Sequence, residues 1–375
     1  MRPFLAHRHV AFGLLLVAAI ASRAATPIAQ TDVYVSGRDG YHTYRIPAVI
    51  HAKNGDLLAF AEGRKTGGGD AGDIDLLVKR STDGGATWGA QHLIWDDAGN
   101  TCGNPCPVLD ETTGTLFLFS THNLGKDREK DIAAGTVRGS RTVWVITSTD
   151  NGATWAQPRD VTSTTKDPSW TWYATGPGIG IQIQHGPHAG RLVIPCDYNY
   201  RNPDPAKKAL QGSHAIYSDD HGQTWQLGGT IKPGMNECQV AELFDDRGTL
   251  LMDMRSYLGR SVRAQATSTD GGATWTAPVD APALIEPVCQ ASLLRDDAAK
   301  LLLFSNPANP KARVNLTVRA SADNAKTWRD VAVLHAGPAA YSSLVALSAT
   351  EAGCLYERGD KKPYEKITFA RFSVK

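Results

Sequence analysis

Short runs of apolar and β-branched residues recur along the whole chain, and turn-forming residues separate them. Typical runs span residues 44–50, 57–62, 115–120, 192–198, 249–255 and 301–306. Apolar runs of this length, bounded by Gly, Asn, Asp and Pro, are typical of β-strands. We find no long amphipathic period of the helical kind. The pattern therefore predicts an all-β chain.

One turn motif follows several of these runs. It reads STDGGATW at 81–88, STDNGATW at 148–155, SDDHGQTW at 218–225 and STDGGATW at 268–275, with a worn copy, SADNAKTW, at 321–328. Asp accepts hydrogen bonds within its own turn, Gly permits a positive φ, and Trp buries a large apolar area. The motif thus predicts a hairpin turn anchored against a sheet. Copies that start about 50 to 70 residues apart favour the repeated four-stranded blades of a β-propeller.

The pattern S-x-D-x-G-x-T-W resembles the Asp-box of sialidase-type propellers, and the string Tyr44-Arg45-Ile46-Pro47 resembles another signature of that family. From about Tyr41 to its C-terminus the chain is similar to the exo-α-sialidases (neuraminidases). The resemblance implies a six-bladed β-propeller whose Asp-boxes lie at the periphery. The box aspartates should then be structural, and they are assigned as Asp83, Asp150, Asp219, Asp270 and Asp323.

The N-terminus has the pattern of a secretory signal peptide. Arg2 and Arg8 flank the start of an apolar run at 10–20 that is too short to span a bilayer, and small residues follow at 22–25. We expect cleavage near Ala21 or Ala24, with an uncleaved anchor as the alternative. No linker-like segment interrupts the rest, so 25–375 should form one soluble catalytic domain. The mature protein should be secreted or periplasmic and monomeric.

Charge and cysteine usage exclude several function classes. The formal net charge of +1 argues against nucleic-acid binding, and an anionic ligand would need local arginines. The six cysteines and the exported context permit disulfides, but several cysteines lie in strand-like runs and should be buried thiols. Neither the cysteines nor the eleven histidines show metal-site spacing. We therefore expect no metal and no cofactor.

The family resemblance implies a carboxylate clamp of three arginines. Arg45 matches the first, Arg255 in the string MDMRS matches the second, and Arg313 matches the third. Arg319 competes with Arg313, but it lies beside an Asp-box and should be exposed. Planar guanidinium groups bind a carboxylate through paired hydrogen bonds and keep their charge. Glu357 matches the glutamate that orients the first arginine.

The same resemblance implies a tyrosine nucleophile, a base and an acid. Tyr341 matches the nucleophile and Glu237 its glutamate partner, with Glu242 as the fallback. Tyrosine has an ordinary pKa of about 10, so a neighbouring base must take its proton. Asp70, in the Gly-rich loop after Arg64, is expected to be the proton donor. The register there is uncertain by a residue, which leaves Asp73 and Asp75 as rivals.

The remaining candidate site residues rest on segments that match the family less specifically. Arg64 should support the acid or the N-acyl pocket, and Tyr198 and Tyr200 resemble a pair that lines the sugar pocket. An ordinary structural role for these two tyrosines stays equally open. Trp170 and Trp172 could contact substrate or anchor a loop, and Asn104 lies in a family-like segment without an assigned role.

These residues together predict a retaining exo-α-sialidase that acts on terminal sialic acids of glycoproteins, glycolipids and oligosaccharides. The covalent intermediate would form on Tyr341. Two alternatives remain: a trans-sialidase or intramolecular trans-sialidase using the same site, and a non-catalytic glycan-binding propeller. A non-catalytic propeller predicts that Tyr341, Glu237 or Asp70 is replaced by another residue type. The chain retains all three.

Overall fold

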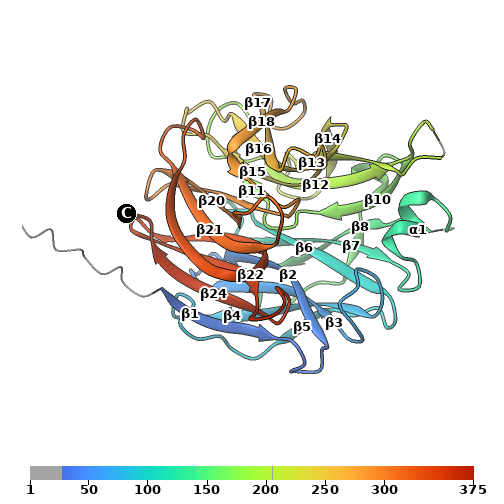
Figure 1. Ribbon diagram of the computed structural model, residues 1–375, viewed down its shortest axis with the longest axis horizontal. Helices are drawn as coiled ribbons and strands as arrows, with labels where there is room; N and C mark the ends of the chain where they lie inside the picture. The colour runs from blue at the N-terminus through green and yellow to red at the C-terminus, as the bar shows by residue number, and fades with distance from the viewer. Residues whose placement is uncertain (1–27, 138, 205) are drawn as a thin grey trace, which may run out of the picture.

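The computed structural model describes residues 28–137, 139–204 and 206–375 (Figure 1). Strands dominate this part of the chain, and its helices are the short α1 (Glu129–Ala134) and α2 (Thr162–Thr165). The all-β prediction is confirmed. The predicted signal peptide lies outside the described residues. Within those residues, no helix is both long and apolar enough to cross a membrane.

The strands form antiparallel meanders that we call blades 1 to 6 in chain order. Blade 1 comprises β2 (Thr43–His51), β3 (Leu57–Arg64), β4 (Ile74–Ser81) and β5 (His92–Trp95). Blade 2 comprises β6 (Thr101–Leu109), β7 (Leu116–Asn123), β8 (Thr142–Ser148) and β9 (Arg159–Asp160). A single parallel bridge, Ile74 to Thr101, joins these two blades into one sheet.

Blades 3 and 4 are separate sheets. Blade 3 comprises β10 (Trp170–Thr175), β11 (Ile181–Gln182), β12 (Leu192–Tyr200), β13 (Leu210–Ser218) and β14 (Gln226–Ile231). Both β10 and β11 pair with β12, so together they supply the first strand position of this blade. Blade 4 comprises β15 (Met235–Glu242), β16 (Leu250–Ser256), β17 (Val262–Ser268) and β18 (Val279–Ile285).

One long strand, β22 (Arg329–Ser348), belongs to both blades 5 and 6. Its first half pairs with β21 and its second half with β23. Blade 5 also contains β19 (Ser292–Asp296), β20 (Leu301–Pro307) and β21 (Val314–Ser321). Blade 6 also contains β23 (Glu351–Arg358), β24 (Lys366–Ser373) and the N-terminal strand β1 (Ala29–Val35).

The pairing of β1 with β24 joins the two ends of the described chain (Figure 1). The first strands of the blades are almost fully buried, as in β6 and β15, whereas outer strands such as β5 and β9 are partly or fully exposed. Apolar clusters fill the space between neighbouring blades, and one such cluster combines side chains of β6–β8 with those of β12 and β13. The fold is a six-bladed β-propeller, as predicted.

The repeated turn motif closes the third strand of a blade. In the second copy, the Asp150 carboxylate accepts hydrogen bonds from Ser148 Oγ at 2.7 Å and from the backbone N–H of Thr154 at 2.9 Å. The motif's tryptophans reach the preceding blade, where Trp155 lies 5.8 Å from Phe60 between ring centroids. The predicted anchored hairpin is confirmed.

The third copy corrects one assignment. Asp220, and not Asp219, accepts the hydrogen bonds from Ser218 and Thr224 that define the turn. Asp219 instead forms an ion pair with Arg191 at 2.7 Å. The physical reason is the register of the turn, which places the residue two positions after the serine against its hydroxyl.

Because consecutive strands of a blade are antiparallel, the repeated turn motif lies on one face of the propeller. Each third strand ends on the face of the propeller opposite to the face where second strands end. We therefore expect Asp150→Ala to lower Tm by about 2–4 °C, because the turn loses its acceptor, while kcat/KM at 25 °C stays unchanged. Differential scanning calorimetry and a standard activity assay measure the two quantities.

Asp360→Ala is the matched control, since that exposed carboxylate makes no hydrogen bond or ion pair among the described residues. A loss of activity in Asp150→Ala without a loss of Tm would contradict the structural role of the turn.

Candidate active site

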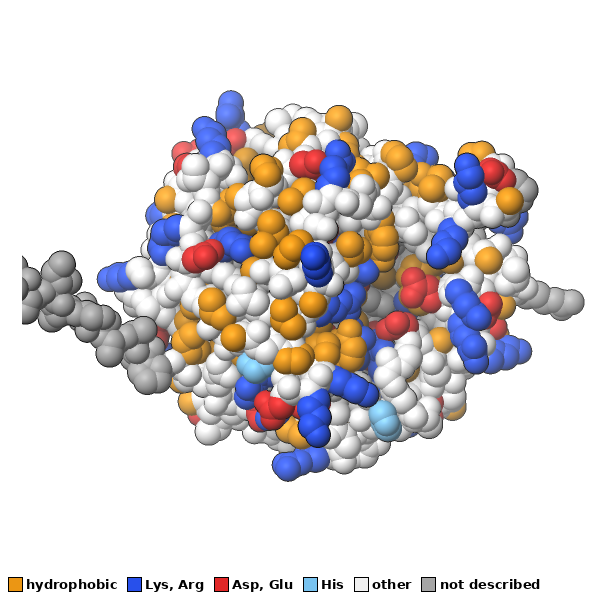
Figure 2. All heavy atoms as spheres, viewed as in Figure 1, with side chains coloured by type: hydrophobic (Ala, Val, Ile, Leu, Met, Phe, Trp, Pro, Cys, Tyr) orange, Lys and Arg blue, Asp and Glu red, His pale blue; other side chains and the backbone are white. Residues whose placement is uncertain are grey.

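A polar pocket of about 330 Å³ lies on the face where first strands begin and second strands end. Arg45, Asn104, Glu237 and Tyr341 reach it from first strands, and Arg64 and Arg255 from the ends of second strands. The pocket combines basic and acidic side chains, as does the visible molecular surface, where the two kinds are interspersed (Figure 2).

Besides β10, which is described below, four first strands change their pairing register at the pocket. The shifts lie between Arg45 and Ala48 in β2, Gly103 and Cys106 in β6, Met235 and Cys238 in β15, and Ala339 and Ser342 in β22. A bulge of this kind bends the strand and redirects its side chains. In β2 the bulge includes Ile46 at φ 58°, a left-handed conformation that is unusual for a β-branched residue. Local strain therefore accompanies the orientation of the pocket residues.

The three predicted arginines converge around the Tyr341 ring. Arg45 Cζ lies 5.0 Å and Arg313 Cζ 5.6 Å from the ring centroid, and Arg255 Nη1 lies 3.4 Å from the phenol oxygen. Tyr364 stacks against Arg45 at 4.0 Å and accepts a hydrogen bond from Arg313 at 2.8 Å. Three fixed positive charges in one pocket make it suitable for a carboxylate.

Glu357 holds the first of these arginines in place. This fully buried carboxylate accepts hydrogen bonds from Arg45 Nε at 2.6 Å, from the Ile46 N–H at 3.0 Å and from the Tyr341 N–H at 3.0 Å. Burial alone would lower the pKa of Arg45, but the charge of Glu357 outweighs it and the pKa is well above its ordinary value. Arg45 therefore remains charged.

Tyr341 and Glu237 form a hydrogen-bonded pair. The phenol donates to Glu237 Oε1, while Glu237 Oε2 accepts from Arg255 Nη1 at 2.6 Å. Burial and then the charge of Glu237 raise the pKa of Tyr341 well above its usual value, despite the opposing effect of Arg255 and Arg313. The tyrosine is consequently a neutral phenol whose proton already points at a carboxylate.

Asp70 projects from the loop between β3 and β4, with 52% of its side chain exposed. Arg64 Nη2 lies 2.8 Å from its carboxylate, and Arg64 Nη1 donates to the Gly68 and Gly69 carbonyls at 2.6 and 2.9 Å. Partial burial raises the pKa of Asp70, but Arg64 and Arg45 outweigh that effect and lower it. In the free protein this carboxyl is therefore ionised.

The alternative residues considered for the acid, the base and the third arginine do not line the pocket. Asp73 and Asp75 pair with Lys65 outside the pocket, and Glu242 lies at the far end of β15, where His185 Nδ1 approaches it at 2.7 Å. Arg319 does not line the pocket either. It is buried and pairs with Asp330 at 3.1 Å, so the expectation that it is exposed was wrong.

The structure does not place Tyr198 and Tyr200 in the pocket, which corrects that assignment. Tyr198 is buried in the core and stacks on Trp170 with ring centroids 3.6 Å apart. Tyr200 packs against the same cluster and contacts Lys232. Side chains alternate along β12, so the pocket receives Asp197 and its two tyrosine neighbours face the other way.

The bulge in β10 separates the two tryptophans. Its register shifts between Trp170 and Tyr173, which places Trp170 in the core and Trp172 on the pocket wall. The Arg141 guanidinium covers Trp172 at 4.0 Å. A period of two would have placed both tryptophans on one face, so sequence reasoning could not separate their roles.

Several further pocket residues were missed from the sequence, among them the charged Arg141, Glu129 and Asp197. Burial lowers the pKa of Arg141, and burial followed by the charges of Glu237 and Glu129 raises that of Asp197 well above normal. For Asp197 the sequence did offer a signal of a functional position, because this aspartate lies inside an otherwise buried strand. Glu129 begins the short helix α1 and Arg141 directly precedes β8, and neither position carried a recognisable sequence signal.

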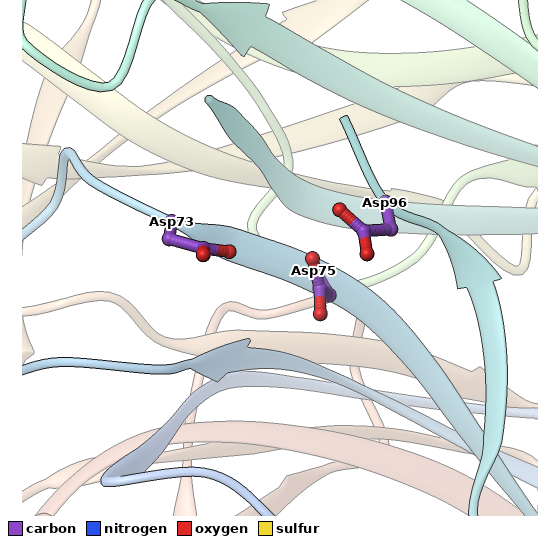
Figure 3. A group of neighbouring side chains, drawn as sticks. All are labelled: Asp73, Asp75 and Asp96. Atoms are coloured by element: carbon purple, nitrogen blue, oxygen red, sulfur yellow. The ribbon is translucent and has the colours of Figure 1, made fainter. Parts of the chain in front are cut away.

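The cysteine expectation is confirmed, because all six are free and buried. Among the described residues, Asp73, Asp75 and Asp96 form the one acidic group compact enough to hold a metal ion. Figure 3 shows these three side chains. Lys65 Nζ lies 3.1 to 3.4 Å from the carboxylates of all three. The ammonium group thus already provides the cation for this group.

Replacing Glu357 by Ala should lower the free energy of unfolding by about 3–5 kcal/mol, because buried Arg45 and two backbone N–H groups lose their acceptor. Urea denaturation followed by tryptophan fluorescence measures this loss. Glu351→Ala removes a more exposed pair with Arg371 and should cost at most about 1 kcal/mol. Equal midpoints for Glu357→Ala and the wild type would contradict the bridging role of Glu357.

Comparisons with known proteins give a consistent result. A family model described as a BNR repeat-like domain matches residues 55–354. A sialidase of Micromonospora viridifaciens is 37% identical over 91% of this chain, which spans 54% of that protein. Mouse sialidase-2 is 32% identical, with 94% of this chain and 97% of that protein covered.

Solved structures are also similar. Hadza microbial sialidase Hz136 has a TM-score of 0.81 and 30% identity, covering 92% of this chain and 68% of its own. An intramolecular trans-sialidase from Ruminococcus gnavus has a TM-score of 0.70 at 20% identity, covering 89% of this chain and 95% of its own, and therefore shares the fold.

Proposed function

The chain belongs to the sialidase family, and on that premise we propose that it is a retaining exo-α-sialidase whose nucleophile is Tyr341. Its substrates are the terminal sialic acids of glycoproteins, glycolipids and oligosaccharides. The observation that carries the proposal is the buried Tyr341–Glu237 hydrogen bond within a cluster of three arginines.

The arginine cluster supports binding of the substrate carboxylate. Glu357 and Glu237 balance part of the charge of Arg45 and Arg255, whereas Arg313 pairs with the neutral Tyr364 hydroxyl. Among the described residues, Arg313 therefore keeps a positive charge near Tyr341 that no carboxylate pairs with. A carboxylate next to the anomeric carbon would face this charge and bring that carbon toward the phenol oxygen.

A neutral nucleophile suits this geometry. An aspartate or glutamate attacking a carbon that bears a carboxylate would be repelled, and sialidases with a tyrosine nucleophile depart from the two-carboxylate mechanism for glycosides. As Tyr341 attacks, Glu237 Oε1 accepts the phenol proton. Arg255, bound to the other oxygen of Glu237, fixes that carboxylate in position.

Asp70 is proposed as the acid that protonates the leaving oxygen and then as the base that activates water. Its carboxyl is ionised in the free protein because of Arg64 and Arg45. A bound substrate carboxylate partly neutralises Arg45, and the sugar excludes water from the exposed Asp70 side chain. Both effects raise the pKa of Asp70 and favour its protonated form in the complex.

Hydrolysis is proposed over transfer to a second sugar. Trp170 lies in the core, and Trp172 is buried beneath Arg141. Neither tryptophan therefore offers an exposed face on which an acceptor sugar could stack. Product analysis with excess lactose measures the partition between free sialic acid and transfer product, and a dominant transfer product would favour the trans-sialidase alternative.

We further propose that the mature protein is an exported monomer. The charged, apolar and small-residue pattern of the N-terminus supports export. Mass spectrometry of the exported protein would locate the cleavage site, and intact residues 1–24 would contradict the proposal.

Tyr341→Phe should lower kcat/KM for a chromogenic α-sialoside by on the order of 10⁴-fold, because it removes the attacking oxygen. Tyr364→Phe removes the equivalent oxygen from a neighbouring tyrosine of the same pocket and is the matched control, with a much smaller loss. Full turnover by Tyr341→Phe would refute the nucleophile assignment. An inactive wild type across a broad pH range and several linkages would refute the proposed function.

Asp70→Asn should lower kcat/KM for sialyllactose by about 10²–10⁴-fold and affect an aryl sialoside much less, since a phenolate leaves without a proton. In the wild type, turnover of sialyllactose needs protonated Asp70 and should decline as pH rises. The lowered pKa of the free protein places this decline in kcat/KM at a lower pH than the decline in kcat. Stopped assays of released sialic acid measure both profiles. Equal losses on the two substrates would contradict the acid assignment.

A further inference from the structure

The loop that carries Asp70 has a second anchor on the side away from the pocket. Lys65 Nζ lies 3.1 Å from Asp73, 3.1 Å from Asp75 and 3.4 Å from Asp96. These three carboxylates come from the end of the loop, the start of β4 and the turn after β5. One ammonium group therefore joins three segments of blade 1 and its connection to blade 2.

Lys65 and Asp73 are the two ends of the loop between β3 and β4. The Lys65 N–H also donates to the Asp73 carbonyl at 3.0 Å, so backbone and side chain close the loop at the same place. The intervening sequence TGGGDAG is rich in glycine and has little intrinsic conformational preference. The position of Asp70 must therefore be set by contacts at two places. One is the pair of loop ends, Lys65 and Asp73, which we call the base, and the other is the segment 68–70, which we call the crown.

Adjacent residues supply these two sets of contacts. Side chains alternate at the end of β3, so Arg64 faces the pocket and binds the Gly68 and Gly69 carbonyls and Asp70. Lys65 faces the opposite side and binds the acidic group. Arg64 thus holds the crown of the loop and Lys65 holds its base.

The acidic group depends on this lysine. Asp75 is 1% exposed, and besides Lys65 its carboxylate meets the Tyr41 hydroxyl at 2.6 Å. The three carboxylates approach one another within 4.8 Å, so without a cation they would repel one another. Because Asp73 lies at the loop end, this repulsion would move the base of the loop and, through it, Asp70.

We propose that Lys65 is a positioning residue for proton transfer, which acts by holding the loop so that Asp70 stays within reach of the leaving oxygen. This inference rests on the proposed function and extends it to a residue outside the pocket. It requires that the effect of Lys65 on turnover passes through Asp70.

The test uses two single variants, Lys65→Met and Lys65→Arg. Lys65→Met keeps an unbranched side chain without the charge, and Lys65→Arg keeps the charge. Each change is also made in the Asp70→Asn background. Kinetics are measured on sialyllactose and on an aryl sialoside with a good leaving group. Lys65→Met should lower kcat/KM for sialyllactose by about ten- to a hundredfold and affect the aryl sialoside far less, while Lys65→Arg retains most of the activity. In the Asp70→Asn background, Lys65→Met should cause little further loss.

If Lys65 only stabilised the fold, the kinetics of its variants would differ from those expected above. Equal losses on both substrates, or losses that multiply in the double variant, would overturn the proposal even if the wild type is an active sialidase. Wild-type activity of Lys65→Met on sialyllactose would also overturn it. A wild type inactive on both substrates would instead refute the proposed function, and the inference with it. Thermal unfolding of each variant is measured beside the kinetics so that a folding defect is recognised as such.

Discussion

The propeller exists as a ring because its first described strand pairs with its last. β1 joins β24 in blade 6, so the two ends of the described chain complete one sheet. The pocket depends on this closure, since Arg45 comes from blade 1 while Tyr341 and Glu357 come from blade 6. Glu357 bonds to the backbone of both blades across this junction. The contacts between blades 1 and 6 therefore also hold Arg45, the first arginine of the proposed carboxylate clamp, beside Tyr341.

Within the closed ring, topology separates stability from chemistry. First strands begin and second strands end at the pocket, whereas the Asp-box turns close third strands on the other face. The pocket ends of four first strands contain bulges, and Ile46 and Asn104 have positive φ values of 58° and 54°. Strained backbone of this kind persists only when the surrounding structure determines it. Buried carboxylates provide such a surrounding here, because Glu357 accepts a hydrogen bond from the Ile46 N–H at 3.0 Å and Glu62 accepts one from the Asn104 N–H at 2.7 Å.

The sequence allowed the fold and much of the pocket to be predicted, because local strings carry both. The Asp-box is a complete turn within eight residues, and the strings around Arg45, Glu237 and Tyr341 are equally local. Side-chain direction was less predictable. Tyr198 and Tyr200 were assigned to the pocket, but the alternation along β12 gives that position to Asp197. Arg141 and Lys65 were not recognised, because Trp172 and Asp96 approach them only in the folded chain and no sequence string marks either contact.

The pocket illustrates how competing electrostatic effects settle the state of a nucleophile. Arg255 and Arg313 favour ionised Tyr341, yet burial and the charge of Glu237 prevail and the phenol stays protonated. A pre-formed phenolate would pair with the arginines and compete with the substrate carboxylate for them. In the proposed mechanism, keeping the proton on Tyr341 leaves the positive charge available to bind substrate, and Glu237 removes the proton as the new bond forms. On this proposal the hydrogen bond between Tyr341 and Glu237 serves binding of the substrate carboxylate as well as attack, because the same carboxylate keeps the phenol neutral and is placed to take its proton.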